Sequence, residues 1–315
     1  MELLSIKLKK ENMKYFYSFI CTTIVLLFCN SVLFAQQIPL LNQSAENLNP
    51  AYLSQDYYKY DLPTAATLRY RNQWTGIKGA PQTILGSFSH FEEDLNFMFG
   101  GDIIHDETGP TGFTGIYGKA GYALKLNKEF LLTVGAKGGL VQYRVRGDEL
   151  TFLEAGDIAN ENVTKLFPDF SVGAMLYYDK NYYIGFSVPQ VFGLDLEFKG
   201  DVKDYNIQRV QHYYGIIGAR FDLEDETWLE VSSQAAYTAN VSFYMGGRLE
   251  FEFRHLFWIA ANGSSAKEAG IGVGAIMDVG MNSNVLKFGY TFSNYFQEYG
   301  SHFGTVHELG ARMSW

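Results

Sequence analysis

The stretch RYRNQWTGIKGAPQTILGSFSHF, residues 69–91, decides the fold of this chain. At its start, Leu68 and Tyr70 alternate with two arginines, and this period of two residues is typical of a β-strand. Two glycines and Pro81 then mark a compact turn. A second run of alternating apolar and small polar residues follows as far as Phe91. The stretch therefore predicts a β-hairpin.

The same alternation recurs through the rest of the chain. Near the C-terminus, Leu286, Phe288 and Tyr290 occupy one parity, whereas Lys287 and Gly289 occupy the other. Runs of this kind predict about 14 strands. Their predicted bounds are 64–74, 82–91, 96–106, 112–126, 129–146, 168–178, 182–191, 211–221, 227–237, 241–251, 255–261, 268–279, 285–292 and 304–315.

The composition and the two strand faces favour a membrane barrel over a soluble sandwich. Aromatic residues make up 16% of the chain and charged residues only 19%, whereas soluble domains usually carry more charge. One face of the predicted strands is apolar, and the other is small and polar, as in the lumen of a transmembrane barrel. We therefore predict an all-β fold, an antiparallel transmembrane outer-membrane β-barrel of about 14 strands over residues 64–315.

The lengths of the connections give a second indication of a barrel. Even-numbered connections such as 127–128 are short, whereas odd-numbered ones, the first and third included, tend to be longer, most clearly at 147–167 and 192–210. Periplasmic turns and extracellular loops alternate in this way, so the first connection is expected on the cell exterior. The last strand is amphipathic and ends on Trp315, which resembles the recognition signal of outer-membrane barrels.

One predicted strand, 129–146, changes parity along its length. Leu132, Val134 and Ala136 are apolar on one parity, and Val141 and Tyr143 are apolar on the other. Two consecutive glycines lie between these groups. We therefore expect a β-bulge marked by glycine at this point.

The N-terminus has the pattern of a secretory signal, because lysines precede an apolar run over residues 15–34. We expect a signal peptide over residues 1–35, starting at Met1 or Met13, with an uncleaved anchor helix as the alternative. Residues 36–63 are expected to form an N-terminal periplasmic lead segment in or beneath the barrel mouth, rather than a disordered lead. Both cysteines of the chain lie within the signal segment, which excludes a disulfide or thiolate site after cleavage.

The sequence offers no site for catalysis, a metal or a cofactor. The six histidines match no metal-binding spacing, and the acidic stretch 148–161 lacks the regular spacing of a calcium loop. Ser89 and His90 point to opposite faces of one strand, and no nucleotide-binding or nucleophile motif is present. A net charge of −9 without a basic stripe argues against nucleic acid as a partner.

Several charged residues fall on the polar parity of the predicted strands, and we expect them to face the lumen. A charged lumen selects a solute or holds a plug; alternatively, paired charges simply fill the interior. The sequence leaves both interpretations open. The residues are Arg69, Arg71, Lys119, Lys137, Arg220, Arg248, Asp102, Glu230 and Glu250.

Motifs along the chain resemble the PorP/SprF family of outer-membrane proteins associated with the type IX secretion system and gliding motility. The most specific is Arg71-Asn72-Gln73-Trp74, followed by Gly76 and by Gly79-Ala80-Pro81. Weaker matches are Asn49-Pro50-Ala51-Tyr52, residues 182–188 and His307-Glu308-Leu309. The chain departs from the family at Thr75, where proline is usual, and at Leu53-Ser54, where Ala-Gly is usual.

The resemblance implies a non-enzymatic role in the outer membrane of a Gram-negative cell. The expected partners are membrane lipid, other components of the secretion machinery, and the C-terminal domain of a secreted cargo such as a gliding adhesin. The candidate contacts are the RNQW and GAP motifs, together with Trp74 and Tyr299, whose alternative role is in an interfacial aromatic girdle. A passive channel for small or hydrophobic solutes is the alternative function.

Overall fold

The structure is a computed structural model, and it describes residues 45–147, 162–191, 194–197, 206–209, 211–223, 225–239, 241–280, 284–296 and 304–315. The predicted signal peptide, the first part of the lead segment, the acidic stretch 148–161 and Tyr299 lie outside these ranges. No helix in the described ranges is long and apolar enough to cross a membrane.

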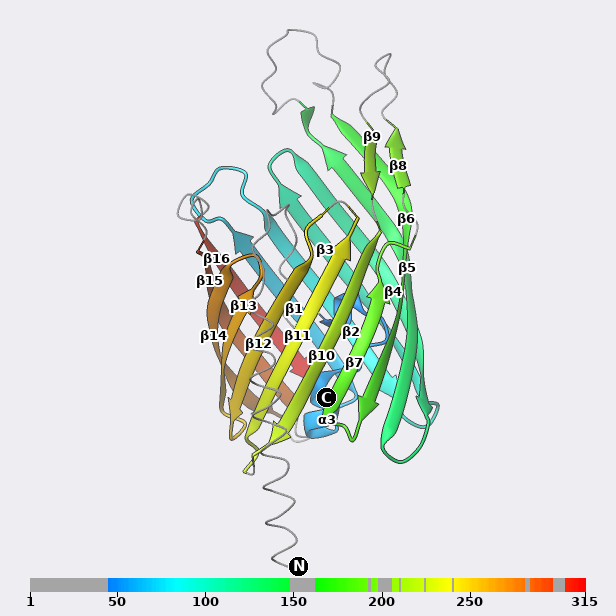
Figure 1. The fold of residues 1–315 in the computed structure, drawn as a ribbon, viewed down its shortest axis with the longest axis vertical. Coiled ribbons are helices and arrows are strands. Elements are labelled where there is room, and N and C mark those ends of the chain that lie inside the picture. Colours follow the sequence, from blue (N-terminus) through cyan, green and yellow to red (C-terminus); the bar gives the residue numbers. More distant parts are fainter. Residues whose placement is uncertain are drawn as a thin grey trace, which may run out of the picture.

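Fourteen antiparallel strands close into a barrel, which confirms the predicted fold (Figure 1). Each barrel strand pairs with the barrel strands before and after it along the chain, and the first strand closes the barrel by pairing with the last. The barrel strands are β1 (Thr64–Gln73), β2 (Gln82–Glu92), β3 (Phe97–Thr108), β4 (Thr111–Lys125), β5 (Phe130–Val145), β6 (Val163–Tyr178), β7 (Tyr182–Val188), β10 (His212–Asp222), β11 (Trp228–Thr238), β12 (Tyr244–Phe253), β13 (Phe257–Ser264), β14 (Glu268–Val279), β15 (Asn284–Tyr295) and β16 (Thr305–Ser314). A separate two-stranded sheet contains β8 (Leu194–Glu197) and β9 (Asn206–Arg209).

The period of two residues sorts the side chains between lipid and lumen. Leu68 in β1 is 60% exposed and Ile271 in β14 is 66% exposed, as expected for residues that face hydrocarbon. On the other parity of β1, Arg69 and Arg71 are buried and face inward. The strand alternation therefore predicted the barrel because an apolar outer face is a physical requirement of a lipid-exposed sheet.

One end of the barrel carries short turns, the start of β1 and the end of β16 (Figure 1). We call it the short-turn end; in outer-membrane barrels this end faces the periplasm. Aromatic side chains contact each other near this end, which is typical of a membrane-interface girdle. The contacting pairs are Phe88–Trp315, Phe97–Phe99, Phe130–Tyr178, Tyr182–Phe221 and Phe253–Phe257.

The predicted bulge in the fifth strand is wrong. The pairing of β5 with β4 and β6 runs one to one through both glycines without an extra residue. Val141 is apolar on the inward parity because it packs in the lumen, where it forms a buried cluster with Tyr117 and Phe167. An apolar patch inside the barrel, rather than a change of register, produced the change of parity in the sequence.

Several boundaries at the long-loop end differ from the prediction, and two of these differences have a clear local reason. β6 begins at Val163 instead of residue 168, so Pro168 lies inside a strand. This proline is tolerated because the β6–β7 ladder ends at the Val172–Val188 pair and needs no N–H donor from residue 168. The third connection is only residues 109–110, not a longer loop, because Gly109 adopts a positive φ of 55° that permits a tight turn.

Candidate functional site: the plugged lumen and the first outer loop

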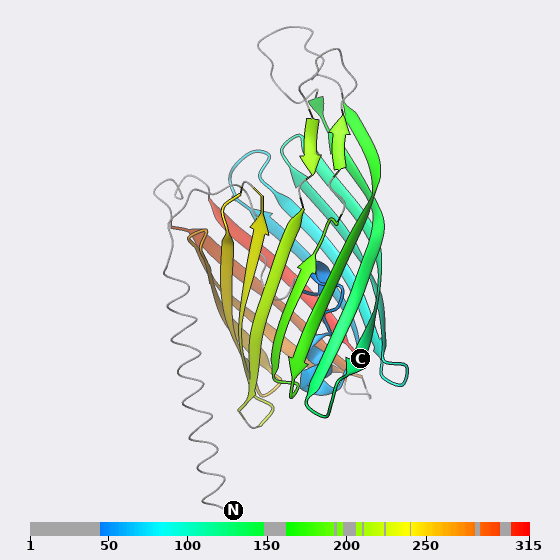
Figure 2. The ribbon, with the colours of Figure 1, turned by 45° about the vertical axis from the view of Figure 1, so that its right-hand side comes forward.

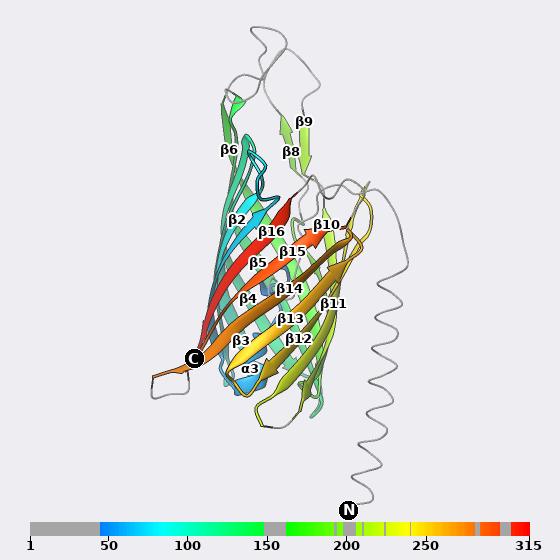
Figure 3. The same ribbon diagram turned by 90° about the vertical axis from the view of Figure 1, so that its left-hand side faces the viewer.

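Residues 45–62 lie inside the barrel, and we call this segment the plug (Figures 2 and 3). It contains two short helices, α2 (Ala45–Leu48) deeper in the barrel and α3 (Gln55–Tyr60) near the short-turn end. The described part of the predicted periplasmic lead segment is therefore inside the lumen instead of beneath it. The reason is geometric, because side chains alone fill a barrel of about 8 strands and leave space in wider ones.

Local sequence defines the helix α3. The side chain of Ser54 accepts a hydrogen bond from the backbone N–H of Asp56, which caps the N-terminus of the helix. Asp61 ends the helix in the left-handed conformation, and its N–H bonds to the carbonyl of Tyr57 at 3.1 Å. These caps set the side chains of α3 against the barrel wall.

The Asn49-Pro50-Ala51-Tyr52 motif anchors the plug to the wall formed by β5, β6 and β7. The amide nitrogen of Asn49 donates to the carbonyls of Ala174 and Phe186, both at 3.2 Å, which are opposed residues of β6 and β7. Thr133 of β5 donates to the carbonyl of Ala51 at 2.6 Å. Pro50 packs directly on Gly135 of β5, where a Cβ atom would lie 2.6 Å from its carbonyl oxygen.

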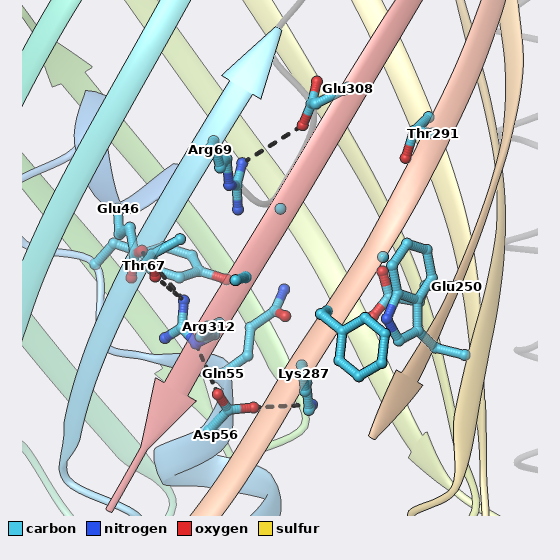
Figure 4. Close-up of a pocket in the computed structure, with 16 residues that line it drawn as sticks. Glu46, Gln55, Asp56, Thr67, Arg69, Glu250, Lys287, Thr291, Glu308 and Arg312 are labelled. Atoms are coloured by element: carbon cyan, nitrogen blue, oxygen red, sulfur yellow. Dashed lines mark hydrogen bonds and ion pairs between the residues drawn. The ribbon is translucent and has the colours of Figure 1, made fainter. Parts of the chain in front are cut away.

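Asp56 is the centre of an ionic cluster on the opposite side of the lumen (Figure 4). Its carboxylate contacts Lys287 of β15 at 2.9 Å and Arg312 of β16 at 2.7 Å, and Ser314 donates to it at 2.6 Å. Burial by itself raises the pKa of the Asp56 carboxyl, but the two ion pairs hold that pKa well below its usual range. Arg312 also pairs with Glu46 of the plug at 3.1 Å.

Lys59 and Gln55 extend this cluster along the wall. The Lys59 ammonium lies 3.2 Å from Glu252 of β12 and 3.5 Å from Glu230 of β11. The Gln55 amide donates to Glu230 at 2.8 Å. One helical turn therefore contacts four strands through polar and charged groups, since Asp56 reaches β15 and β16.

Arg220 of β10 is enclosed by aromatic rings and one carboxylate. Its guanidinium lies 5.0 Å from the ring centre of Tyr58 in the plug and 4.6 Å from that of Tyr183 in β7. It also pairs with Glu230 at 3.6 Å and donates to the Tyr52 hydroxyl at 3.4 Å. Arg220 thus joins the plug to the barrel by a cation–π contact with Tyr58 and a hydrogen bond to Tyr52.

The structure places all the charged residues expected in the lumen on its inner face, where each has an oppositely charged neighbour. Asp102 binds both Lys119 and Lys137, and these lysines also donate to backbone carbonyls of the plug. Seven of the eight residues outside the RNQW motif are buried, and Glu250 is half-buried. The remaining strand pairs are Arg69–Glu308 at 4.0 Å and Arg248–Glu250 at 2.6 Å. The lumen therefore pairs its charges internally and also holds the plug.

Several lumen residues were missing from the sequence-based set. Glu252, Lys287, Glu308 and Arg312 lie on the inward parity of their strands and were identifiable by the same alternation. The plug residues had no such signal, because helices of four and six residues are too short to show a period in the sequence. One recess of about 60 Å³ lies between α3 and the wall of β15 and β16, lined by Asp56, Lys287, Thr291 and Glu308 among others (Figure 4).

The RNQWTGIKGAP stretch divides between the lumen and the outer end of the barrel. Arg71 points inward and pairs with Glu308 at 3.3 Å and Glu268 at 3.6 Å, and Gln73 donates to the Tyr295 hydroxyl at 3.0 Å. These two side chains are therefore not positioned to meet a partner from the outside. The loop at the long-loop end comprises only residues 74–81.

This first loop is held in place from both sides. Its turn uses positive φ angles at Trp74 (59°), Gly76 (98°) and Gly79 (75°). The N–H of Thr75 bonds to the carbonyl of Thr305 at 3.0 Å, and Gly79 accepts from the N–H of Gly109 at 2.8 Å. A recess of about 680 Å³ adjoins the loop, lined by Asn72, Gly76, Gly79, Ala80, Glu107 and Arg146 among others.

Within the described residues, no group of three or more histidine, cysteine or acidic side chains is arranged to hold a metal ion. Ser89 and His90 lie on opposite faces of β2, and His90 bonds to Thr64 at 2.8 Å. The sites that remain are the plugged lumen and the first loop.

A family model described as type IX secretion system membrane protein PorP/SprF matches residues 33–313, nearly the whole chain. The chain belongs to the PorP/SprF family. This confirms the family suggested by the RNQW and GAP motifs, and it assigns this PorP/SprF protein to the outer membrane and to type IX secretion. The family and the barrel are those of a secretion membrane protein rather than of an enzyme. No curated protein matches the sequence.

Solved structures similar to this PorP/SprF protein are outer-membrane barrels. The CymD monoaromatic hydrocarbon channel aligns with a TM-score of 0.52 and 11% identity, covering 87% of this chain and 92% of the channel. A Pseudomonas aeruginosa FadL homologue aligns with a TM-score of 0.47 and 12% identity, covering 88% and 93%. At 11% identity, the similarity to CymD establishes the fold alone.

Proposed function

We propose that this PorP/SprF protein supports the secretion or surface attachment of large proteins, such as gliding adhesins, by binding their C-terminal domain at its outer end. Other components of the type IX machinery would act beside it in the membrane. Residues 1–35 serve as the signal peptide that directs export, and the mature chain then inserts as a barrel.

The observation that carries this proposal is the occupied lumen. Two recesses between the plug and the wall measure about 60 Å³ and about 20 Å³, and each has room for only a few water molecules. A barrel whose lumen is filled and ion-paired in this way is not built as a permanently open pore. Its outer surface is then the part that meets other proteins.

The first loop is the surface that we assign to the cargo. Residues 75–79 are exposed, and hydrogen bonds to Thr305 and Gly109 hold the loop between its two neighbours. A loop that is already ordered loses little conformational entropy when it binds a partner. The recess beside it, with Glu107 and Arg146 in its wall, offers polar groups for specific contacts.

Deletion of the gene, followed by proteomics of the culture supernatant and the cell surface, tests the proposal. We expect loss or mislocalisation of one or more large secreted proteins. Replacing Ile77-Lys78 in the exposed loop with Ser-Ser should reproduce the defect while barrel assembly stays normal. The matched control replaces Lys128-Glu129, in an exposed turn at the opposite end, with Ser-Ser. Unchanged secretion in the deletion strain would refute the role in export.

A further inference from the structure

After α2, the plug has two halves whose polar contacts with the wall differ in kind. The anchor half, Asn49 to Leu53, is held by neutral hydrogen bonds and close packing on Gly135 and Gly173. The N–H of Leu53 also bonds to the Tyr177 hydroxyl at 2.8 Å. No ion pair contributes to this half within the described residues.

The ionic half, Ser54 to Tyr60, makes its polar contacts mainly through charge, and its Tyr58 also packs on Tyr177 in the hydrophobic cluster that contains Leu53. Asp56 and Lys59 make ion pairs to β11, β12, β15 and β16, and Gln55 adds a hydrogen bond to Glu230. Arg312 donates to the Ser54 hydroxyl at 2.6 Å. All these partners belong to one wall of the lumen, opposite the strands that hold the anchor half.

The wall beside the ionic half includes two glycines, one of which is covered by the ring of Trp258. Gly289 and Gly310 line the recess between α3 and β15–β16, next to Lys287 and Arg312 (Figure 4). The helix α3 lies near the short-turn end of the barrel, so nothing deeper in the lumen has to move before it does (Figure 1). The recess therefore adjoins the helix that blocks this side of the lumen.

We propose that the ionic half is a gate, hinged on the anchor half at one end and on the start of β1 at the other, and that its movement toward the short-turn end opens a passage for small hydrophilic solutes. A helix with its side chains is about 10 Å across, so withdrawal of α3 frees a passage of that order. Residues of both signs line it, including Arg69, Glu250, Lys287 and Glu308. This activity goes beyond the proposed role in secretion and does not depend on it.

The difference in chemistry explains why the ionic half opens first. When α3 leaves, Lys287, Arg312 and Glu252 face the water that enters, so each buried ion pair is exchanged for hydration and no charge stays buried without a partner. Withdrawal of α3 exposes Tyr58, and release of the anchor half would expose the buried side chains of Tyr52 and Leu53 as well, at a further cost. Local opening therefore stops at the hinge.

Native-state proteolysis of the intact, folded barrel in detergent, where trypsin reaches the short-turn end, tests the gate. The Lys59 side chain is 1% exposed when α3 is in place, so trypsin cuts after Lys59 only when the gate opens. We expect slow cleavage that creates an N-terminus at Tyr60 while the barrel keeps its heat-modifiable migration on gels. Asp56→Asn should raise this cleavage rate by about 100-fold, because it leaves Lys287 and Arg312 short of a charge partner.

The matched control is Asp225→Asn, which removes an exposed carboxylate paired with Arg254 at 3.4 Å in a short turn at the same end. It should leave the cleavage rate at Lys59 unchanged. In planar bilayers, the wild-type protein should show a closed state with brief openings, and Asp56→Asn should stay open for longer. These readouts do not involve secretion, so their failure is distinguishable from failure of the proposed function.

Three results would overturn the gate. The first is cleavage at Lys59 that appears only together with loss of the folded barrel. The second is an assembled Asp56→Asn barrel that is cut at the wild-type rate. The third is a steady, large conductance of the wild-type protein, since the lumen would then be open with α3 in place. If Asp56→Asn does not assemble, cleavage and conductance of the wild-type protein decide the question alone.

Discussion

The contact between Pro50 and Gly135 gives the sharpest prediction about the plug. A Cβ atom at position 135 would lie 2.6 Å from the carbonyl oxygen of Pro50 and 2.9 Å from the N–H nitrogen of Ala51. Ordinary contacts begin at 3.4 Å, so Gly135→Ala has to displace the plug backbone by about 0.8 Å. A backbone atom cannot turn aside as the end of a flexible side chain does.

The cost follows from what that displacement breaks. Thr133 loses a good hydrogen bond to the carbonyl of Ala51, and the neighbouring bond from Leu53 to Tyr177 is strained. Loss of one such bond costs about 1 kcal/mol, and overpacking adds about 2 kcal/mol. We expect docking of the plug to weaken by about 3 kcal/mol, which is about 150-fold in the docking equilibrium.

Protease protection of the plug, measured on the assembled barrel in detergent, checks this value. Gly118→Ala is the matched control, because nothing lies within 4 Å of a Cβ atom at that position. Gly135→Ala should expose the plug to cleavage far more than Gly118→Ala does. In a chain that lacks residues 45–62, both substitutions should be equivalent. Equal protection in the full-length variants would refute the assignment of Gly135 as a plug contact.

Three further predictions concern the lumen. Arg220→Met should destabilise the folded barrel by about 3–5 kcal/mol in urea unfolding, because Glu230 loses its buried guanidinium partner. Docking lowers the pKa of the Asp56 carboxyl below its ordinary value of 3.8, so its contribution to docking is fully present above pH 3.8 and is lost as the pH falls through the lower pKa of the docked state. Resistance of the plug to pepsin should therefore persist at pH 4 and fall only at more acidic pH. Gly274→Ala places a Cβ atom 2.3 Å from the indole nitrogen of Trp258 and should alter tryptophan fluorescence and cost about 1–3 kcal/mol of stability.

The strand pattern was predictable because each lipid-facing strand has to carry its own apolar face. Leu286, Phe288 and Tyr290 meet this requirement one strand at a time, without reference to any distant residue. The lumen is different, since its residues are paired and packed across the barrel. No single strand therefore has to carry a uniformly polar inner face. Val141 therefore misled the sequence-based interpretation, because an apolar residue inside the barrel looks the same in sequence as one outside it.

The plug was not predictable from local pattern for a related reason. Asp56 and Arg312 are far apart in sequence, and they meet only after the barrel has closed and the segment has entered it. The lead segment shows mixed polarity without a period, so the sequence indicated a position near the mouth but no contacts. What selects its place is the unfilled width of the barrel and the pairing of charges across it.

The position of the RNQW motif changes how mutations in it should be interpreted. As a linear motif it suggests one surface, but Arg71 is buried with Glu268 and Glu308 in the lumen, whereas residues 74–81 form the loop. Replacing Arg71 would leave two carboxylates buried without their partner. A secretion defect caused by an Arg71 substitution is therefore explained by the barrel interior. Only loop substitutions that leave assembly intact, such as at Ile77, report on binding of a partner.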